Sequence, residues 1–401
     1  MARPSRATFA AAKYPRGVTA HPAPDLDRRP SRREEILAAA SELFHGRGYA
    51  GVTVDQISAS MGMSGPALYR HYSGKQDLLR AVVDDAVRRI EAVVQHDDGD
   101  DRFITPLAEA WGGTAHLGSI LEREIAHLDD EARHGFEARI AAVFDTIART
   151  LGADPRTSPF VARAMVAVAG SSSFSRTGRD ALDPGVIGRA LRALALGHGL
   201  GAADMVDAAE LHHSLVRDWL PRDEAILAAL PGIAFDRGGI GAVTLEAVGS
   251  SAGISGPSVY NYFDSKAALW TAWLGRVAHW STSSLQQALA YSESPEDVMR
   301  RALDGYTEMT RRVPAFAMPV DPSDPRIPAE TRTEIETMSS GYLGLWLVCA
   351  QTARPELSAR EAEALFLAAH AVINTARTMS APWAIPADAA LSRLALAVFM
   401  A

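Results

Sequence analysis

One nine-residue stretch occurs twice in this chain. Residues 64–72 read Ser-Gly-Pro-Ala-Leu-Tyr-Arg-His-Tyr, and residues 255–263 read Ser-Gly-Pro-Ser-Val-Tyr-Asn-Tyr-Phe, so the copies lie 191 residues apart. A constant offset of this size is typical of an internal duplication. The chain is therefore predicted to contain two copies of one structural unit. The same offset aligns Phe44 with Phe235, Thr53 with Thr244, Gly62 with Gly253, and Lys75 with Lys266.

The lysines support this alignment. The chain has 40 lysines and arginines, of which only Lys13, Lys75 and Lys266 are lysine. Two of these three occupy the same position of the repeat, which chance explains poorly. We expect this position to serve the same purpose in both copies.

Composition narrows the class of protein. The 401 residues are enough for two or three domains, and a hydrophobic fraction of 47% allows a large core. Cys349 is the only cysteine, which excludes an intrachain disulfide and a cysteine-based metal site and favours a reducing, cytoplasmic compartment. No apolar run reaches the roughly 18 residues of a membrane span. Residues 1–30 lack the apolar segment of a secretory signal.

The first copy has the pattern of four helices. Apolar residues recur at helical spacing over 31–48, and a second helix is expected after the N-cap residue Thr53. Gly62 permits a tight turn, and a third helix is expected to follow with Ser64 as its N-cap. A fourth helix is predicted over 74–96.

The second copy repeats this plan from Pro221 onwards. Pro231 stands in the middle of its first helix and is predicted to kink or split that helix. Elsewhere the apolar spacing is helical, and residues 200–220 are predicted to form a helical linker. No stretch alternates with a period of two, so no sheet is expected. The remaining helices are predicted at 103–117, 118–128, 130–151, 158–174, 183–198, 295–312, 329–353, 358–379 and 386–400.

Two short helices joined by a glycine turn are the pattern of a helix-turn-helix, whose second helix enters the major groove of DNA. The first amides of a helix suit phosphate, lysine and tyrosine add donors, and the second helix reads base edges. In the first copy the predicted DNA contacts are Thr53, Ser64, Gly65, Pro66, Ala67, Tyr69, Arg70, His71 and Lys75. In the second copy they are Thr244, Ser255, Gly256, Pro257, Ser258, Tyr260, Asn261, Tyr262 and Lys266.

The two heads are predicted to read related but different sequences. Arg70 in the first copy corresponds to Asn261 in the second, and arginine favours guanine whereas asparagine favours adenine. Ala67, which suits a thymine methyl group, corresponds to Ser258. The two halves of the binding site are therefore expected to differ.

The charges also differ between the two copies. The net charge of −8 averages over the whole surface, whereas DNA binding needs only local positive charge. Residues 28–80 carry a net +3 and residues 222–276 a net −1, so the first head is expected to be the stronger anchor. A degenerate, structural second copy stays open as an alternative. Residues 1–30 are predicted to be a disordered arm whose arginines touch phosphate or the minor groove, or else a solvated tail without a role.

These residues resemble the N-terminal pattern of the TetR family of bacterial transcriptional regulators. The match over about 222–270 is looser than that over about 32–80, because Tyr262 stands where the family has histidine and Pro231 interrupts the first helix. In the first copy the matching residues are Ile36, Leu37, Ala40, Leu43, Phe44, Gly48, Tyr49, Thr53, Val54, Ile57, Gly62, Ser64, Leu68, Tyr69, His71, Tyr72, Lys75, Leu78 and Leu79. In the second they are Phe235, Gly239, Thr244, Val248, Gly253, Ser255, Val259, Tyr260, Phe263, Lys266 and Leu269.

The resemblance implies an all-α protein with two TetR-like repeats, each made of a helix-turn-helix DNA-binding head and a helical ligand-binding and dimerisation body. One family subunit is about as long as one repeat, so the halves are expected to form an intrachain pseudo-dimer, with helices at about 158–198 packing on those at about 358–400. The implied domains are an arm (1–30), a first head (31–80), a first body (81–200), a linker (201–220), a second head (221–271) and a second body (272–401).

The resemblance further implies a sequence-specific transcriptional regulator, expected to be a repressor, rather than an enzyme. Its implied partners are double-stranded operator DNA, non-palindromic or an imperfect repeat, and a small lipophilic, lipid-like effector that relieves DNA binding. Tandem members of this kind resemble regulators of lipid or sterol metabolism. No cofactor, metal or membrane is expected, and the protein is expected to be a monomeric pseudo-dimer or a homodimer of it.

A helical body can hold an apolar cavity with a few polar groups. For every candidate side chain, ordinary core packing is the competing interpretation. The candidates for contact with an effector are Trp111, His116, Phe136, Met165 and Phe174 in the first half, and Tyr306, Met309, Trp346, His370 and Asn374 in the second.

Two rival functions remain to be weighed. A helical-bundle metalloenzyme would use Glu-x-x-His pairs, a spacing found in di-iron proteins, but the pairs here lie in polar, surface-like contexts. They are Glu124 with His127, Glu131 with His134, and Glu210 with His213. The other rival is a structural or anti-regulator protein that has lost DNA binding, in which Lys75→Ala and Tyr69→Ala would cause no loss of function.

Overall fold

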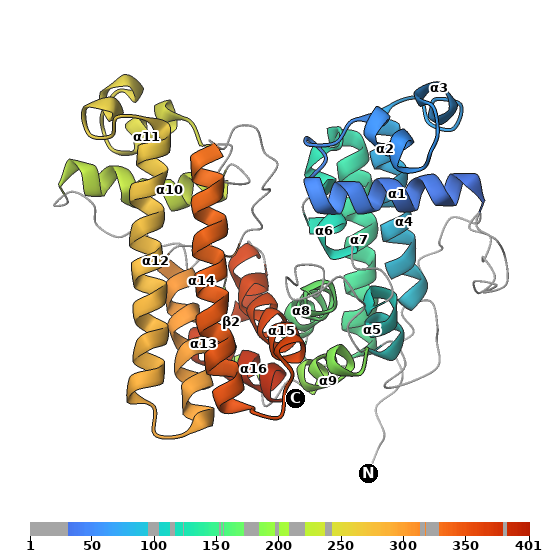
Figure 1. Ribbon diagram of the computed structural model, residues 1–401. Coiled ribbons are helices and arrows are strands. Elements are labelled where there is room, and N and C mark those ends of the chain that lie inside the picture. The colour runs from blue at the N-terminus through green and yellow to red at the C-terminus, as the bar shows by residue number, and fades with distance from the viewer. Residues whose placement is uncertain are drawn as a thin grey trace, which may run out of the picture.

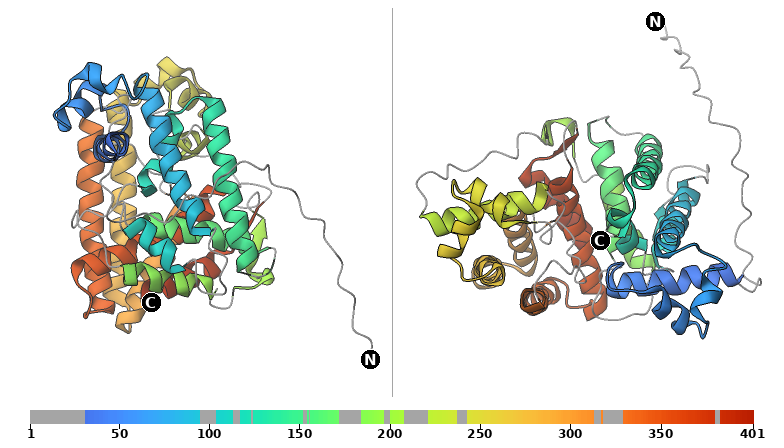
Figure 2. Two further views of the ribbon diagram at one scale, coloured as in Figure 1. Left: turned by 90° about the vertical axis from the view of Figure 1, so that its right-hand side faces the viewer. Right: turned by 90° about the horizontal axis from the view of Figure 1, so that it is seen from above.

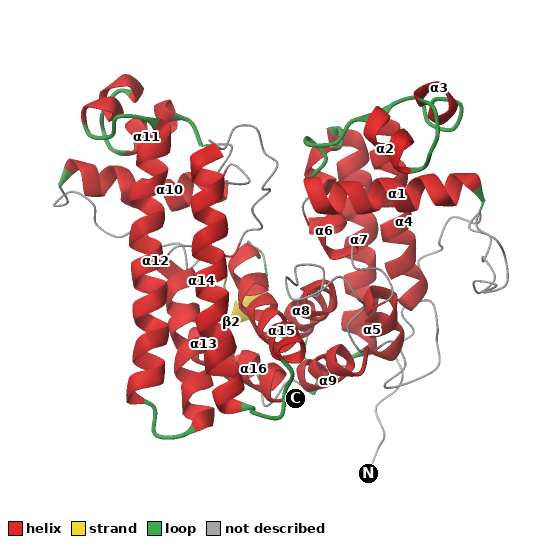
Figure 3. Cartoon of the chain, viewed as in Figure 1, coloured by secondary structure: helices red, strands yellow, loops and turns green. Residues whose placement is uncertain are grey.

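The computed structural model describes residues 31–94, 104–112, 117–122, 124–151, 154, 156–171, 184–196, 200–207, 221–236, 243–312, 317, 329–379 and 383–401. Helices make up most of these residues, as Figure 3 shows. The predicted all-α class is confirmed.

The first half begins with a head of three helices that stands on a long helix, α4. Its elements are α1 (Arg32–Arg47), α2 (Val54–Ser60), α3 (Gly65–Leu68), α4 (Lys75–Val94), α5 (Ile104–Gly112), α6 (Leu117–Glu122), the 3₁₀ helix η1 (Glu124–His127), α7 (Asp130–Thr150), α8 (Ser158–Ser171) and α9 (Pro184–Ala195).

The second half repeats this order. A short 3₁₀ helix η4 (Ala202–Asp204) and strand β1 (Met205–Asp207) precede it. Its elements are α10 (Arg222–Asp236), α11 (Leu245–Ser251), the 3₁₀ helix η7 (Gly256–Asn261), α12 (Lys266–Tyr291), α13 (Pro295–Arg312), α14 (Ala329–Ala353), α15 (Ala359–Thr378), strand β2 (Ala384–Pro386) and α16 (Asp388–Met400).

The two halves meet through their last two helices. Helices α8 and α9 pack against α15 and α16 between the halves (Figure 1). Small side chains such as Ala164 on α8 and Ala368 on α15 are fully buried and allow close helix packing. Arg189 of α9 also donates from Nε to the Ala401 carbonyl at 3.0 Å. The two halves of the chain therefore pack on each other through α8, α9, α15 and α16.

Two features of the fold differ from the sequence-based expectation. Residues 205–207 form β1 and pair antiparallel with β2, so the expectation of no sheet and of a helical linker throughout 200–220 is wrong here. Helix α10 runs unsplit through Pro231. The buried residues Leu227, Leu230 and Ala234 hold the helix on both sides of the proline, and their burial offsets the roughly 3 kcal/mol that an interior proline costs.

The two heads are anchored differently. The described core of the first head is continuous with the core of the bodies. The second head has a core of its own around Trp270 and Trp273, against which Ile335 and Met338 of α14 pack. None of the described helices has the length and hydrophobicity needed to cross a bilayer.

Candidate DNA-binding interface

The first head is built from a capped helix and a glycine turn. Gln56 N donates to Thr53 Oγ1 at 3.2 Å, and Thr53 N donates to Gln56 Oε1 at 2.9 Å, so α2 begins with a complete capping box. Gly62 has φ +64°, a conformation that favours glycine, and turns the chain toward α3. Leu68 and Tyr72 are buried and fix α3 on the head. The predicted cap and turn are confirmed.

The turn that follows α3 exposes side chains that the sequence predicts at DNA. Tyr69 is 53% exposed, although large aromatic side chains are usually covered. Arg70 and His71 are exposed beside it. Of the other predicted contacts in this head, Thr53, Ser64 and Pro66 are exposed, and Gly65, Ala67 and Lys75 are half-buried.

Ser64 is not the side-chain cap that the sequence predicts. No first-turn amide of α3 donates to its hydroxyl. The neighbouring Gly65 packs closely on α2, where a Cβ would meet Asp55 Oδ1 at 2.8 Å. The exposed Ser64 hydroxyl therefore lies at the start of α3 without a capping role.

Lys75, at the start of α4, rests on an aromatic ring. Its Nζ lies 4.0 Å from the ring centroid of Tyr49 in a cation–π contact. Burial lowers the pKa of Lys75, while the carboxylate of Glu124 acts in the opposite direction. The lysine is therefore held in one place rather than extended into solvent.

The second head repeats the cap and turn with a tighter recognition element. Ala247 N donates to Thr244 Oγ1 at 3.3 Å, and Gly253 has φ +71°. The element that follows is the 3₁₀ helix η7 rather than an α-helix, and Ser258 N donates to Ser255 Oγ at 3.3 Å. A Cβ at Gly249 of α11 would lie 2.7 Å from the Ser255 carbonyl carbon, so these two elements touch backbone to backbone.

The exposed face of η7 is uncharged. Tyr260 and Tyr262 are 51% and 45% exposed, and Asn261 is exposed between them. Among the other predicted contacts, Thr244, Ser255 and Pro257 are exposed, Ser258 and Lys266 are half-buried, and Gly256 is buried.

Two arginines of this head serve its own structure. Arg222 donates from Nη1 to the Ala252 carbonyl at 2.6 Å, and Arg276 forms an ion pair with Glu224.

Both heads lie at the same end of the molecule. Helix α3 and the η7 segment stand at the top of Figure 1, and the left view of Figure 2 again places both heads at one end. The bodies and the α8–α9–α15–α16 contact lie below them. A fold that exposes helix-turn-helix elements in this way is typical of a DNA-binding regulator.

Comparison with known proteins places the chain in a family. The sequence pattern described as "Bacterial regulatory proteins, tetR family" matches twice, at residues 36–82 and 234–272. The HTH-type transcriptional activator FasR of Mycolicibacterium smegmatis is 30% identical over 157 residues, which is 36% of this chain and 72% of FasR. The chain belongs to the TetR family of bacterial regulatory proteins and is a DNA-binding transcriptional regulator, not an enzyme.

Other relatives match over shorter parts. The HTH-type transcriptional repressor KstR2 of Rhodococcus jostii is 26% identical over 135 residues, so the chain spans 66% of that protein. The repressor AcnR of Corynebacterium diphtheriae is 38% identical, but the chain spans only 35% of its length. The solved structure of ketosteroid transcriptional regulator KstR2 of Mycobacterium tuberculosis has a TM-score of 0.36 and 20% identity, covering 42% of this chain and 95% of that chain.

The predicted effector contacts of the second half come together. The Tyr306 and His370 ring centroids lie 3.9 Å apart, and Trp346 lies 4.6 Å from His370. Tyr306 donates from its hydroxyl to Asn374 Oδ1 at 2.8 Å. Met309 is buried and accepts from Ser281 Oγ at 2.9 Å.

The predicted effector contacts of the first half are not shown as a cluster. Phe136 of α7 and Met165 of α8 are buried. The side chain of Trp111 is not among those described, and His116 and Phe174 lie outside the described residues.

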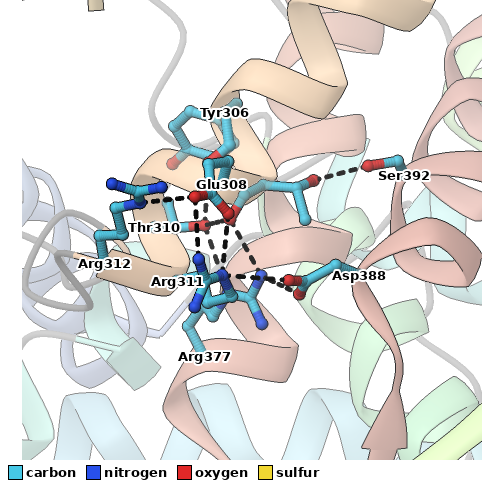
Figure 4. Close-up of polar contacts among 9 residues, drawn as sticks. Tyr306, Glu308, Thr310, Arg311, Arg312, Arg377, Asp388 and Ser392 are labelled. Carbon is cyan, nitrogen blue, oxygen red and sulfur yellow. Dashed lines mark hydrogen bonds and ion pairs between the residues drawn. The ribbon is translucent and has the colours of Figure 1, made fainter. Parts of the chain in front are cut away.

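The sequence did not reveal the polar network beside the second-half cluster (Figure 4). Arg377 of α15 donates to Thr310 Oγ1, to the Thr307 carbonyl and to Asp388. Ser392 of α16 donates to Thr307 Oγ1 at 2.9 Å. The network joins α13, α15 and α16, and no spacing of residues in the sequence predicts it.

The described carboxylate, imidazole and thiol groups do not gather in threes as a metal site would require. Glu124 and His127 fall on η1 and Glu131 and His134 on α7, while Glu210 and His213 lie outside the described residues. The described Glu-x-x-His pairs therefore do not assemble the ligand set of a di-iron bundle.

Proposed function

We propose that this chain binds a non-palindromic operator as a single-chain pseudo-dimer, with α3 reading one half-site and η7 the other. The observation that carries the proposal is the pair of exposed recognition elements at the same end of a chain whose two halves pack on each other. Arg70 and His71 of the first head supply charged donors, whereas Asn261 and Tyr262 of the second supply neutral ones. The half-sites are therefore unequal in both sequence and electrostatic strength.

We further propose that a small apolar effector with one polar group relieves DNA binding by contacting the second body. His370 Nδ1 lies 2.9 Å from the Phe366 carbonyl, which can only accept, so Nδ1 carries the hydrogen. Burial lowers the pKa of His370 to about 3, so the ring is neutral and Nε2 is an acceptor. His370 Nε2 is buried and has no hydrogen-bond partner among the residues that the structure describes. A bound hydroxyl could donate to it.

Such an effector acts only if it prefers one state of the protein. A ligand of equal affinity for the DNA-binding and non-binding states shifts nothing. The second body contacts the second head through α12 and α14, where Ile335 and Met338 reach its core. We propose that effector binding alters the second head through these contacts and so relieves DNA binding.

The first experiment is selection of sheared genomic DNA by the purified full chain, with sequencing at footprint resolution. Two related but unequal half-motifs, with centres about one helical turn or a multiple of it apart, would support the proposal. A single half-motif would mean that the second head does not read DNA. No enrichment at low salt would overturn operator binding. The enriched sites would also name the target genes.

A further inference from the structure

A buried carboxylate from the first body reaches into the first head. Glu124 lies on η1, is fully buried, and accepts the Tyr49 amide hydrogen at 2.8 Å. Tyr49 belongs to the segment between α1 and α2, so this bond joins head and body directly. Burying a carboxylate is costly unless donors or a cation compensate for the lost water. The cost of burying the Glu124 carboxylate indicates that this residue has a specific role.

Tyr49 also links Glu124 to the lysine of the repeat. Lys75 Nζ stands 4.0 Å from the Tyr49 ring centroid and interacts electrostatically with Glu124. The ring of His127, also on η1, stacks on Tyr49 with centroids 5.3 Å apart. Gln76, next to Lys75, donates from Nε2 to the His127 carbonyl at 2.9 Å. The short η1 helix thus holds both Tyr49 and the first turn of α4.

We propose that Glu124 is a positioning residue for operator binding, which holds Lys75 so that its ammonium group meets a DNA phosphate. This role rests on the proposed operator binding. The lysine, which rests on the ring of Tyr49, then lies between the phosphate and the residue that the buried carboxylate of Glu124 holds. His127 supports the same contact between body and head, because its ring stacks on Tyr49 and its carbonyl accepts from Gln76.

The proposal and simple electrostatics predict opposite results. Removing a negative charge near DNA should strengthen binding if only long-range attraction counts. If Glu124 positions Lys75, removing its charge should weaken binding instead. Glu124→Gln is the suitable change because the amide oxygen can still accept from the Tyr49 amide. The matched control is Asp129→Asn, which removes one negative charge from the exposed pair with Arg80 (2.7 Å) in the same region.

The experiment measures affinity for the selected operator at several salt concentrations, together with thermal unfolding. Glu124→Gln should lower affinity about tenfold, the loss of one charge-assisted contact, and flatten the salt dependence by about one phosphate contact. The affinity of the Asp129→Asn variant for the operator should stay within about twofold of that of the wild type. In a Lys75→Ala background, Glu124→Gln should have no further effect, because it acts through that lysine.

Unchanged or tighter binding by Glu124→Gln, or additive losses in the double variant, would overturn the positioning role while leaving operator binding intact. If Glu124→Gln does not fold, His127→Ala gives the second test. It removes the ring on Tyr49 but keeps the carbonyl that Gln76 uses, and it should weaken binding in the same direction. A wild-type chain that selects no DNA would overturn the proposed function and this role together.

Discussion

Arg377 and Asp388 join the last two helices of the second half. Arg377, only 4% exposed near the end of α15, donates from Nη2 to Asp388 Oδ1 at the start of α16 at 2.7 Å. The same guanidinium holds the Thr307 carbonyl and Thr310 Oγ1 of α13 (Figure 4). One buried cation thus ties together three helices, two of which, α15 and α16, contact the first half of the chain.

Removing the carboxylate of Asp388 should leave the buried guanidinium of Arg377 without a compensating negative charge. Asp388→Ala is expected to lower the free energy of unfolding by about 2 kcal/mol, less than the roughly 3–5 kcal/mol of a fully buried pair because Asp388 is 35% exposed. Urea unfolding followed by circular dichroism measures the change. Arg311→Ala removes a more exposed partner of Asp388, 3.3 Å away, and should cost less than about 1 kcal/mol. Equal effects of the two changes would contradict the assigned role of Arg377.

The two recognition elements should respond differently to salt. Arg70→Ala is expected to weaken operator binding by about 1–3 kcal/mol. If Arg70 contacts the DNA backbone, the change should also reduce the salt dependence of binding by about one phosphate contact. If Arg70 contacts guanine, the change should instead relax specificity at that base. Asn261→Ala removes no charge, so it should relax specificity in the other half-site without changing the slope. Titrations of both variants on operators with either half-site scrambled separate these outcomes. A salt slope that falls with Asn261→Ala would contradict the neutral role of the second head.

Much of this fold follows from local patterns. Helices α13 and α14 begin and end at the residues predicted from the sequence, 295–312 and 329–353, because their apolar faces are periodic and proline-rich segments flank them. Gly62 and Gly253 mark both turns, since only a positive φ fits there. The pairing of the two halves follows from the repeat.

The features that the sequence-based predictions missed all depend on contacts between residues that are far apart in the sequence. Strands β1 and β2 have only three residues each, and even the paired residues Asp207 and Ala384 lie 177 positions apart (384 − 207), so no local alternation reveals the strands. Pro231 is tolerated because its neighbours are buried on the head. Glu124 was visible only as half of a Glu-x-x-His spacing, and its contact with Tyr49 depends on how the first body folds beneath the head.

The neutral state of His370 should make stability fall in acid. The folded-state pKa, lowered by burial to about 3, lies below the ordinary value of 6.5, so only the unfolded chain takes up the proton as the pH falls below about 6.5. Stability is therefore full above that pH and is lost progressively toward pH 3, by about 2 kcal/mol at pH 5. Unfolding free energies at pH 7.5 and 5 should differ less in His370→Asn than in the wild type. An equal pH dependence would mean that His370 is protonated in the folded protein.

The backbone contact between α11 and η7 offers a way to disable one head alone. Gly249→Ala would place a Cβ 2.7 Å from the Ser255 carbonyl carbon, so η7 must shift, and such overpacking costs about 1–3 kcal/mol. Because the second head has a core of its own, the damage should stay there. Footprinting should then show the half-site of η7 unprotected and that of α3 still protected. Gly275→Ala on α12, where a Cβ meets nothing within 4 Å, is the control and should leave both footprints intact. Loss of both footprints with Gly249→Ala would show that the heads bind DNA only together.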